Sequence, residues 1–263
     1  MNTQYGNENL SNDDQLAYEF ANESYKKEAD RRKNIDGYEL DEKLSNVNTA
    51  VYHHHGKKDT RVGHRGSTSG FDWYGSDTMI ALGAEDHSSR HKKALQTTKD
   101  AHDKHGYTVM AHGHSLGQNI SNVITEKLGE EDWYKGTIGF NAGVSHLGRA
   151  NPFSKQRREC RRKTNRPKYC DKTTNIYEKN DYVSNNNALC SFATAGMGGR
   201  LCRKQVGYGN QKFYDHSSKS KNRFVNALTT TVNTVAPIRV FSNGKNHSLS
   251  VFEKKDRDDK SKS

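Results

Sequence analysis

The clearest alternation of apolar and polar positions in the chain lies between residues 107 and 129. A short run of strand-forming residues, Tyr107 to Met110, is followed by Gly-His-Ser-Leu-Gly at positions 113–117. Apolar side chains then recur at intervals of three and four residues, which predicts a helix with one apolar face that ends near Gly129. These apolar positions are Leu116, Ile120, Val123, Ile124 and Leu128. The stretch therefore predicts a strand, a sharp turn at Ser115 and a helix.

Other strands and helices are predicted on both sides of this stretch. Before it, the pattern predicts a helix over 13–32, a hairpin with strands over 49–55 and 60–65, and a charged helix over 87–105. After it, the pattern predicts strands over 135–143 and 175–177, an irregular glycine-rich region over 184–222, and a hairpin over 238–252. Because strands alternate with helices, we expect an α/β fold with a largely parallel central sheet and helices on both faces.

The length of 263 residues suits a single domain, which we expect to span residues 13–252. A flexible N-terminus (1–12) would precede this domain, and a disordered charged tail (253–263) would follow it. A basic insertion covers about 145–173. The core should be small, because only 31% of the residues are hydrophobic and because His112 and Asn141 interrupt the predicted central strands.

The charge of the chain is strongly positive, with 42 Lys and Arg residues against 31 Asp and Glu, a net charge of +11. Such an excess favours contact with phospholipid headgroups, nucleic acid or an acidic partner. Part of it is gathered in the insertion, which we expect to be a solvated loop. A nuclear-import-like patch and a contact for anionic lipid or nucleic acid are the alternatives. Its basic residues are Lys155, Arg157, Arg158, Arg161, Arg162 and Lys163. Few aromatic residues interleave with them, so binding of nucleic acid is not favoured.

The chain contains no run of about 18 apolar residues, so we expect no transmembrane segment. Its first residues lack the layout of a signal peptide, which favours an intracellular or particle-associated protein. Four cysteines, Cys160, Cys170, Cys190 and Cys202, match no zinc-binding spacing. Free thiols are expected in a reducing compartment, whereas Cys160–Cys170 and Cys190–Cys202 are plausible local bridges in an oxidising one.

The Gly-x-Ser-x-Gly sequence between a strand and a helix is typical of the nucleophile elbow of α/β-hydrolases. In such a turn the serine is strained, and Gly113 and Gly117 would remove Cβ atoms that collide where the strand and the helix meet. The amide of Leu116 would point to the same place as the serine oxygen, with the positive end of the helix behind it. A plain helix N-cap is the alternative interpretation of Ser115.

An attacking serine needs an imidazole to take its proton and a carboxylate to hold that imidazole in one tautomer. Asp181 follows a predicted strand end, where the sites of open α/β sheets gather, although a turn aspartate or Asp171 are alternatives. Among the late histidines, His247 lies in the predicted final hairpin and His216 competes with it.

Taken together, these features resemble the class 3 (fungal-type) lipases over about residues 14–252. The motifs that carry the resemblance follow the family order: an Ala-x-x-x-Tyr helix, Arg65-Gly66-Ser67, Asp72-Trp73 with Asp77, the 113–117 motif, Asn180-Asp181-x-Val183, and His247. The resemblance implies an α/β-hydrolase fold and cleavage of carboxylic esters of glycerides or phospholipids, without a metal or a cofactor. It implies Ser115 as nucleophile, Asp181 as the orienting carboxylate, His247 as base, and Ser67 with Leu116 as the oxyanion hole.

Three positions depart from the family pattern. Gln118 stands where the family has a small residue, Val62-Gly63-His64 is less apolar than the usual strand, and no proline follows Phe140. These departures concern the solidity of the fold more than the chemistry. The rival hypothesis is a non-catalytic protein on a lipase-like scaffold that binds nucleic acid or an acidic structural partner through its basic surface.

The histidine-rich segments do not predict a metal site. His53, His54 and His55 would alternate between the two faces of a strand and cannot converge. The pairs His87/His91 and His102/His105 have helical spacing but lack a third ligand in the sequence.

Overall fold

The computed structural model describes residues 3–5, 10–66, 89–142, 155–162, 164–178 and 209–214. Within these ranges a nine-stranded sheet has the order β1-β9-β8-β7-β6-β5-β4-β3-β2. The strands are β1 (Thr3–Tyr5), β2 (Asn34–Ile35), β3 (Tyr38–Leu40), β4 (Thr49–His54), β5 (Asp59–His64), β6 (Thr108–His114), β7 (Tyr134–Phe140), β8 (Thr173–Glu178) and β9 (Asn210–Tyr214). The helices are α1 (Asn12–Glu23), α3 (Ser89–Asp103), α4 (Leu116–Leu128) and α5 (Lys155–Cys160), with short 3₁₀ turns at Glu28–Asp30 and Lys168–Cys170.

The central strands are parallel, as the alternation of strands and helices predicted. Strands β5 to β9 and β1 run in one direction, whereas β2, β3 and β4 are joined to them by antiparallel pairs. His64 in β5 pairs with Gly113 in β6, His114 with Phe140 in β7, and Phe140 with Ile176 in β8. The carboxyl ends of four neighbouring strands therefore lie at one edge of the sheet, the edge at which such folds place their sites.

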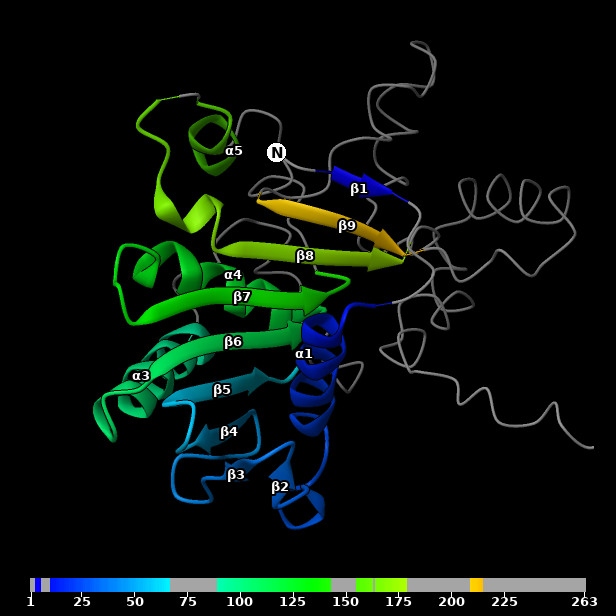
Figure 1. The fold of residues 1–263 in the computed structure, drawn as a ribbon, viewed down its shortest axis with the longest axis vertical. Coiled ribbons are helices and arrows are strands. Elements are labelled where there is room, and N and C mark those ends of the chain that lie inside the picture. The colour runs from blue at the N-terminus through cyan, green and yellow to red at the C-terminus, as the bar shows by residue number, and fades with distance from the viewer. Residues whose placement is uncertain are drawn as a thin grey trace, which may run out of the picture.

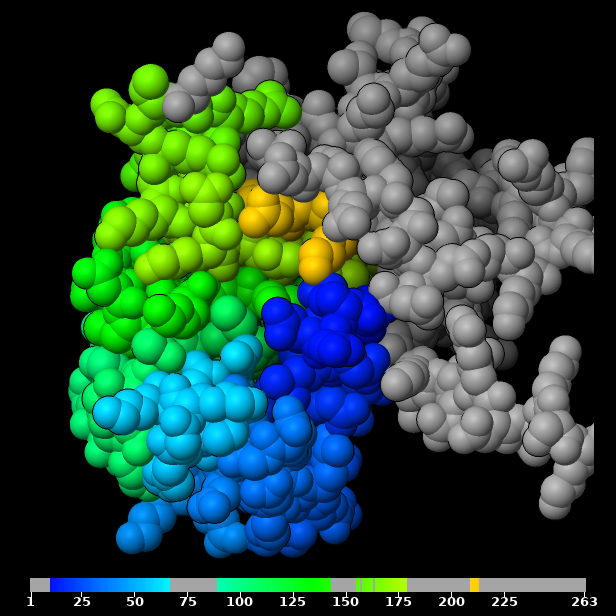
Figure 2. Space-filling model, in the orientation of Figure 1, coloured from blue at the N-terminus to red at the C-terminus, as the bar shows by residue number. Residues whose placement is uncertain are grey.

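Helices cover both faces of this sheet (Figure 1). On one face, α3 and α4 pack their apolar sides against β4, β5 and β6 in a cluster that includes Ala94, Ile120 and Val62. On the other face, α1 contributes Ala17 and Ala21 to a separate cluster. Figure 2 shows α1 lying over that face, between the β2–β4 region at one end and β9 at the other. The chain is thus an α/β fold with three layers.

The polar residues that interrupt the central strands are hydrogen-bonded within the core. His112 stacks on the ring of Phe20, with centroids 5.7 Å apart, and its Nδ1 bonds the Ile138 carbonyl oxygen at 3.0 Å. The side-chain oxygen of Asn141 accepts a 2.8 Å hydrogen bond from the amide of Glu178. Because these buried polar groups have hydrogen-bond partners, burying them costs little folding free energy. Their hydrogen bonds join neighbouring strands, so the sheet tolerates its sparse apolar content.

The helix predicted over 13–32 is shorter than expected. Ser11 and Asp14 cap its start reciprocally, and it ends at Glu23, whose fully buried carboxylate accepts 2.6 Å and 3.1 Å hydrogen bonds from Arg32 Nε and the Arg32 amide. Lys26 Nζ donates a further 2.8 Å hydrogen bond to the same carboxylate. These contacts hold the chain after Glu23 against the end of the helix. The periodicity of apolar residues does not predict such contacts.

Several strands were missed by the sequence analysis. The β2–β3 hairpin turns at Asp36-Gly37, with φ of 50° and 83°, a pair that favours this turn and could have indicated it. β9 lies inside the region expected to be irregular, and β1 inside the segment expected to be flexible. The β4–β5 hairpin is confirmed. The predicted final hairpin and the charged tail lie outside the described residues.

The basic insertion contains α5, which a Cys160–Cys170 disulfide joins to the 3₁₀ turn before β8. Of the two sequence-based alternatives, the local bridge is therefore observed for this pair, and Cys190 and Cys202 lie outside the described ranges. The side chains of Lys155, Arg158, Arg161 and Arg162 are exposed. Among the helices in the described part of the chain, none has the length and apolar character needed to cross a membrane.

Candidate active site

Ser115 has a backbone conformation that L-residues rarely adopt. It lies between the end of β6 and the start of α4 with φ of 56° and ψ of −123°. Its ψ is far from the value of about +47° of the left-handed helical region, so this is not an ordinary turn conformation. Strain of this kind persists only where the surrounding structure imposes it, and it clusters at functional sites. This strained strand-to-helix serine is the conformation expected of a nucleophile elbow.

Two glycines permit the close approach of strand and helix at this turn. A Cβ atom at Gly113 would lie 2.4 Å from the carbonyl carbon of Gly117, and one at Gly117 would lie 2.0 Å from the carbonyl oxygen of His64. Both contacts involve backbone atoms, which cannot move aside as a flexible side chain could. The predicted collision is confirmed, and the motif spacing follows from packing.

The Ser115 hydroxyl does not cap α4. Ser115 occupies the N-cap position, but its side chain makes no capping hydrogen bond. Its backbone holds the turn instead: the amide donates to the Phe140 carbonyl at 3.0 Å, and the carbonyl accepts from Asn119 at 3.1 Å. The alternative in which the Ser115 side chain serves only to cap the helix is therefore wrong. Leu116 follows as the first residue of α4, where amides point away from the helix and the helix dipole is positive.

The end of β5 packs against the elbow. A Cβ at Gly66 would lie 2.7 Å from the carbonyl oxygen of His114, the residue before Ser115. Tyr25 Oη lies 2.8 Å from His114 Nδ1, and burial raises the pKa of this phenol, so it stays protonated. Arg90, at the start of α3, donates hydrogen bonds to the carbonyl oxygens of Arg65 and Gly66. The chain is thus fixed beside the elbow up to Gly66, while Ser67 itself lies outside the described residues.

Asp181 and His247 also lie outside the described residues, as does the competing His216. The described chain leads toward Asp181 along β8, which ends at Glu178 at the same edge of the sheet as Ser115. Asp171, the alternative carboxylate, precedes β8 at the opposite edge, where it pairs with Arg166 at 3.1 Å. Asp171 therefore cannot serve a base beside Ser115.

Comparison with known proteins comes from structure alone, because no protein family and no curated protein matches the sequence. Fungal lipases are among the similar solved structures. A triacylglycerol lipase from Penicillium expansum is 19% identical over 50% of this chain and 60% of its own, with a TM-score of 0.36. Rhizomucor miehei lipase in complex with its propeptide is 13% identical over 65% and 61%, with a TM-score of 0.40. Lip2 lipase from Yarrowia lipolytica is 12% identical over 70% and 77%, with a TM-score of 0.41.

This likeness has a limited extent. The chain spans about 60% of the length of the first two lipases. At identities under 20% and TM-scores under 0.5 the likeness carries no argument about activity. The sheet order and the backbone geometry at Ser115 themselves establish the α/β fold and the strained strand-to-helix turn.

The departure from the lipase pattern at Gln118 has a structural counterpart. The Gln118 side chain is buried beneath the elbow, where its Nε2 donates 3.0 Å hydrogen bonds to the side-chain oxygens of Asn122 and Asn175. Its Oε1 accepts a hydrogen bond from the Thr137 hydroxyl at 3.3 Å. A polar network joining α4, β7 and β8 therefore replaces small-residue packing at this position.

Away from Ser115, a cluster of one aspartate and two histidines joins residues far apart in the sequence. Asp41, His53 and His105 bring three ligand-type atoms within 4.8 Å of one another, which local spacing could not reveal. His53 Nε2 lies 2.9 Å from Asp41 Oδ2, an oxygen that also takes a hydrogen bond from Lys104. Despite burial, the hydrogen bonds from Lys104 and His53 hold the pKa of Asp41 below its usual value. The Asp41 carboxylate already has a cationic partner in Lys104 and a hydrogen-bonding partner in His53. We therefore interpret the Asp41–His53 contact as structural rather than as part of a metal site.

Proposed function

We propose that the chain is a serine ester hydrolase of lipase type that cleaves carboxylic esters of glycerides or phospholipids through an acyl-enzyme. One observation carries the proposal: the strained backbone of Ser115, with φ of 56° and ψ of −123°, at the junction of β6 and α4. Ser115 precedes the first residue of α4, and its hydroxyl makes no capping hydrogen bond. A strained serine that has no capping role is best explained by chemistry at its oxygen.

In the proposed mechanism, the Ser115 oxygen attacks the ester carbonyl while His247 takes the hydroxyl proton. Asp181 holds the imidazole in the required tautomer. The tetrahedral intermediate then collapses: the bond to the alcohol breaks, and His247 returns the proton to the leaving oxygen. Water, deprotonated by the same imidazole, attacks the acyl-enzyme and releases the carboxylic acid and free Ser115. Neither a metal nor a cofactor takes part in these steps.

The negative oxygen of the tetrahedral intermediate needs hydrogen-bond donors that are in place before the reaction. Leu116 is the first residue of α4 and directly follows Ser115, so its amide is well placed to be the first donor. Ser67 is proposed as the second donor, since it directly follows Gly66, whose backbone packs against the His114 carbonyl. Loss of one such donor costs roughly a hundredfold or more in kcat.

The test is labelling with a fluorophosphonate probe followed by peptide mapping. We expect the label on Ser115 and none after Ser115→Ala, which should also abolish hydrolysis of a short-chain nitrophenyl ester. Ser121→Ala is the matched control, because Ser121 lies in α4, which follows the turn at Ser115, and its hydroxyl donates a 3.0 Å hydrogen bond to the Gly117 carbonyl oxygen. This variant should keep both label and turnover.

Turnover retained by Ser115→Ala would overturn the mechanism. Absence of labelling in the parent chain, together with DNA affinity that falls steeply with salt, would favour the non-catalytic alternative. The exposed side chains of Lys155, Arg158, Arg161 and Arg162 give that alternative, and contact with an anionic membrane, a physical basis. The Arg157 side chain and Lys163 lie outside the described part of the structure.

A further inference from the structure

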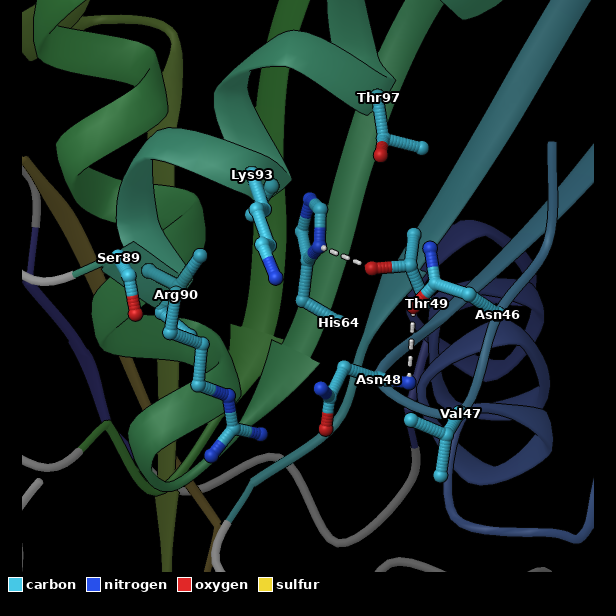
Figure 3. Close-up of a pocket in the computed structure, with 11 residues that line it drawn as sticks. Asn46, Val47, Asn48, Thr49, His64, Ser89, Arg90, Lys93 and Thr97 are labelled. Atoms are coloured by element: carbon cyan, nitrogen blue, oxygen red, sulfur yellow. Dashed lines mark hydrogen bonds between the residues drawn. The ribbon is translucent and has the colours of Figure 1, made fainter.

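A cavity of about 440 Å³ lies on the α3 side of the sheet, close to the end of β5 (Figure 3). The loop before β4, the strands β4 and β5, and the helices α3 and α4 all contribute to its wall. Its polar lining includes Asn48, Thr49, His64, Ser89, Arg90 and Lys93. A volume of this size is typical of small-molecule sites and well above that of a single water.

The charge of the cavity wall has one sign. Arg90 and Lys93 are cationic, and none of the described residues that line the cavity is Asp or Glu. The Lys93 side chain is exposed at the first turns of α3, so this flexible side chain is free to turn toward a ligand in the cavity. A pocket wall with two cations and no carboxylate favours an anion.

His64 supplies a buried polar atom that lacks a partner. The residue is 1% exposed, and its ring nitrogen Nε2 has no hydrogen-bond partner among the described residues. Its other nitrogen, Nδ1, lies 3.5 Å from the Thr49 hydroxyl oxygen. Figure 3 shows the ring between Thr49 and Lys93 in this view. When Nδ1 accepts the Thr49 hydroxyl, the neutral ring carries its proton on Nε2 as a donor in need of an acceptor.

The imidazole of His64 stays neutral at ordinary pH. Burial, with smaller contributions from Arg90 and His91, lowers the pKa of His64 to about 3. The wall of the cavity therefore holds a neutral imidazole, which donates through Nε2 when Nδ1 accepts from Thr49, together with two cationic side chains. Such a combination recognises oxygen atoms that carry negative charge.

We propose that this cavity binds a phosphate group, either free or as part of a lipid headgroup. The donors come from three directions, with His64 on β5, Lys93 on α3 and Asn48 on the loop before β4. The Arg90 guanidinium already donates to the Arg65 and Gly66 carbonyl oxygens, so it contributes its positive charge to the cavity wall. A tetrahedral anion can use donors so placed, whereas the two oxygens of a carboxylate lie in one plane. The volume leaves room for a polyol attached to the phosphate. This proposal does not depend on catalysis by Ser115.

The test measures binding to the Ser115→Ala protein by calorimetry at constant ionic strength, so that turnover and bulk screening do not contribute. One arm uses inorganic phosphate and glycerol 3-phosphate, and the other uses vesicles of phosphatidic acid in phosphatidylcholine. Saturable binding of the soluble probes supports a site for free phosphate. Saturable binding of the vesicles alone supports a headgroup site. Failure of both arms at probe concentrations up to about 10 mM overturns the proposal.

Two lysines on α3 provide a matched pair of variants. Lys93→Gln removes a cation from the cavity wall, whereas Lys92→Gln makes the same change in charge at the neighbouring exposed residue, which does not line the cavity. We expect Lys93→Gln to weaken binding about tenfold and Lys92→Gln to change it less than about twofold. Equal effects would show attraction to the surface charge alone and would overturn the site.

His64→Phe keeps an aromatic ring of similar size and removes both nitrogens. It should weaken phosphate binding about tenfold or more while leaving the circular dichroism spectrum unchanged. Binding unaffected by this variant would remove His64 from the site. Since Lys93 is exposed, its variant keeps the proposal testable if His64→Phe does not fold.

Discussion

Gly139 in β7 leaves the space that the Gln118 side chain fills beneath the turn at Ser115. A Cβ atom at position 139 would lie 1.7 Å from Gln118 Oε1 and 2.6 Å from the Gly113 carbonyl oxygen. The two residues are thus complementary across the junction of α4 with the sheet. A glutamine at 118 requires a residue without a side chain at 139.

Gly139→Ala should therefore lower the free energy of unfolding by about 3 kcal/mol, since overfilling a packed core displaces its neighbours. In a Gln118→Ala background the same change should cost at least about 1 kcal/mol less, because only the Gly113 carbonyl remains in the way. Urea unfolding of the four proteins measures this coupling. Additive effects would mean that the two positions do not share the space.

Gly117→Ala should abolish fluorophosphonate labelling and lower the free energy of unfolding by roughly 3 kcal/mol. Its Cβ would lie 2.0 Å from the His64 carbonyl oxygen, so α4 must move away from β5 or the turn must open. Gly56→Ala is the control, because a Cβ there meets only the His54 side chain at 3.4 Å. Full labelling of Gly117→Ala would contradict the elbow geometry.

Stability should fall as the pH is lowered from about 6.5 toward 3. Burial, followed by Arg61, lowers the pKa of His112 to about 3, and burial does the same for His64. An unfolded imidazole has a pKa near 6.5, so in this window the unfolded state binds more protons than the folded state. Each histidine then adds about 1.4 kcal/mol per pH unit to the slope of the unfolding free energy.

Urea titrations at several pH values measure that slope, and nuclear magnetic resonance can follow the two imidazoles directly. Both rings should remain neutral in the folded protein at pH 5. A chemical-shift change at pH 5 to 6 in either ring would show that it is solvated, which would contradict its burial.

Reduction of the Cys160–Cys170 disulfide should destabilise α5 while leaving the central sheet in place. The two cysteines and Tyr169 form a buried cluster of their own, separate from the clusters on the sheet. With a sequence separation of 10, the crosslink should contribute about 2–3 kcal/mol. Hydrogen exchange should accelerate in 155–160 after reduction and stay unchanged in β6. Faster exchange in β6 as well would mean that the insertion supports the sheet.

The elbow could be predicted from sequence because its determinants are local. A Cβ atom at Gly113 would collide with Gly117 only four residues later, so the spacing of the motif records this requirement. The contact of Gly117 with the His64 carbonyl oxygen is not local. The β4–β5 hairpin has the same local character. The Asp36-Gly37 turn was equally local and its signal was overlooked.

Other features depend on contacts between distant residues, which no periodicity records. His53 meets His105 only because β4 lies next to the end of α3 in the folded chain, and Gln118 is matched by Gly139 across two elements. The polar core was expected to be weak because His112 was counted as an interruption. Its hydrogen bond to Ile138 and its stacking on Phe20 make it part of the packing instead.

The strand Thr3–Tyr5 has a practical consequence for handling the protein. It pairs in parallel with β9 and so occupies the backbone groups along that margin of the sheet. A variant that lacks residues 1–5 would leave the N–H and C=O groups of β9 unpaired on that side. Strands from other molecules could then pair with β9, which is a common route to aggregation. Soluble preparations should therefore retain Thr3–Tyr5.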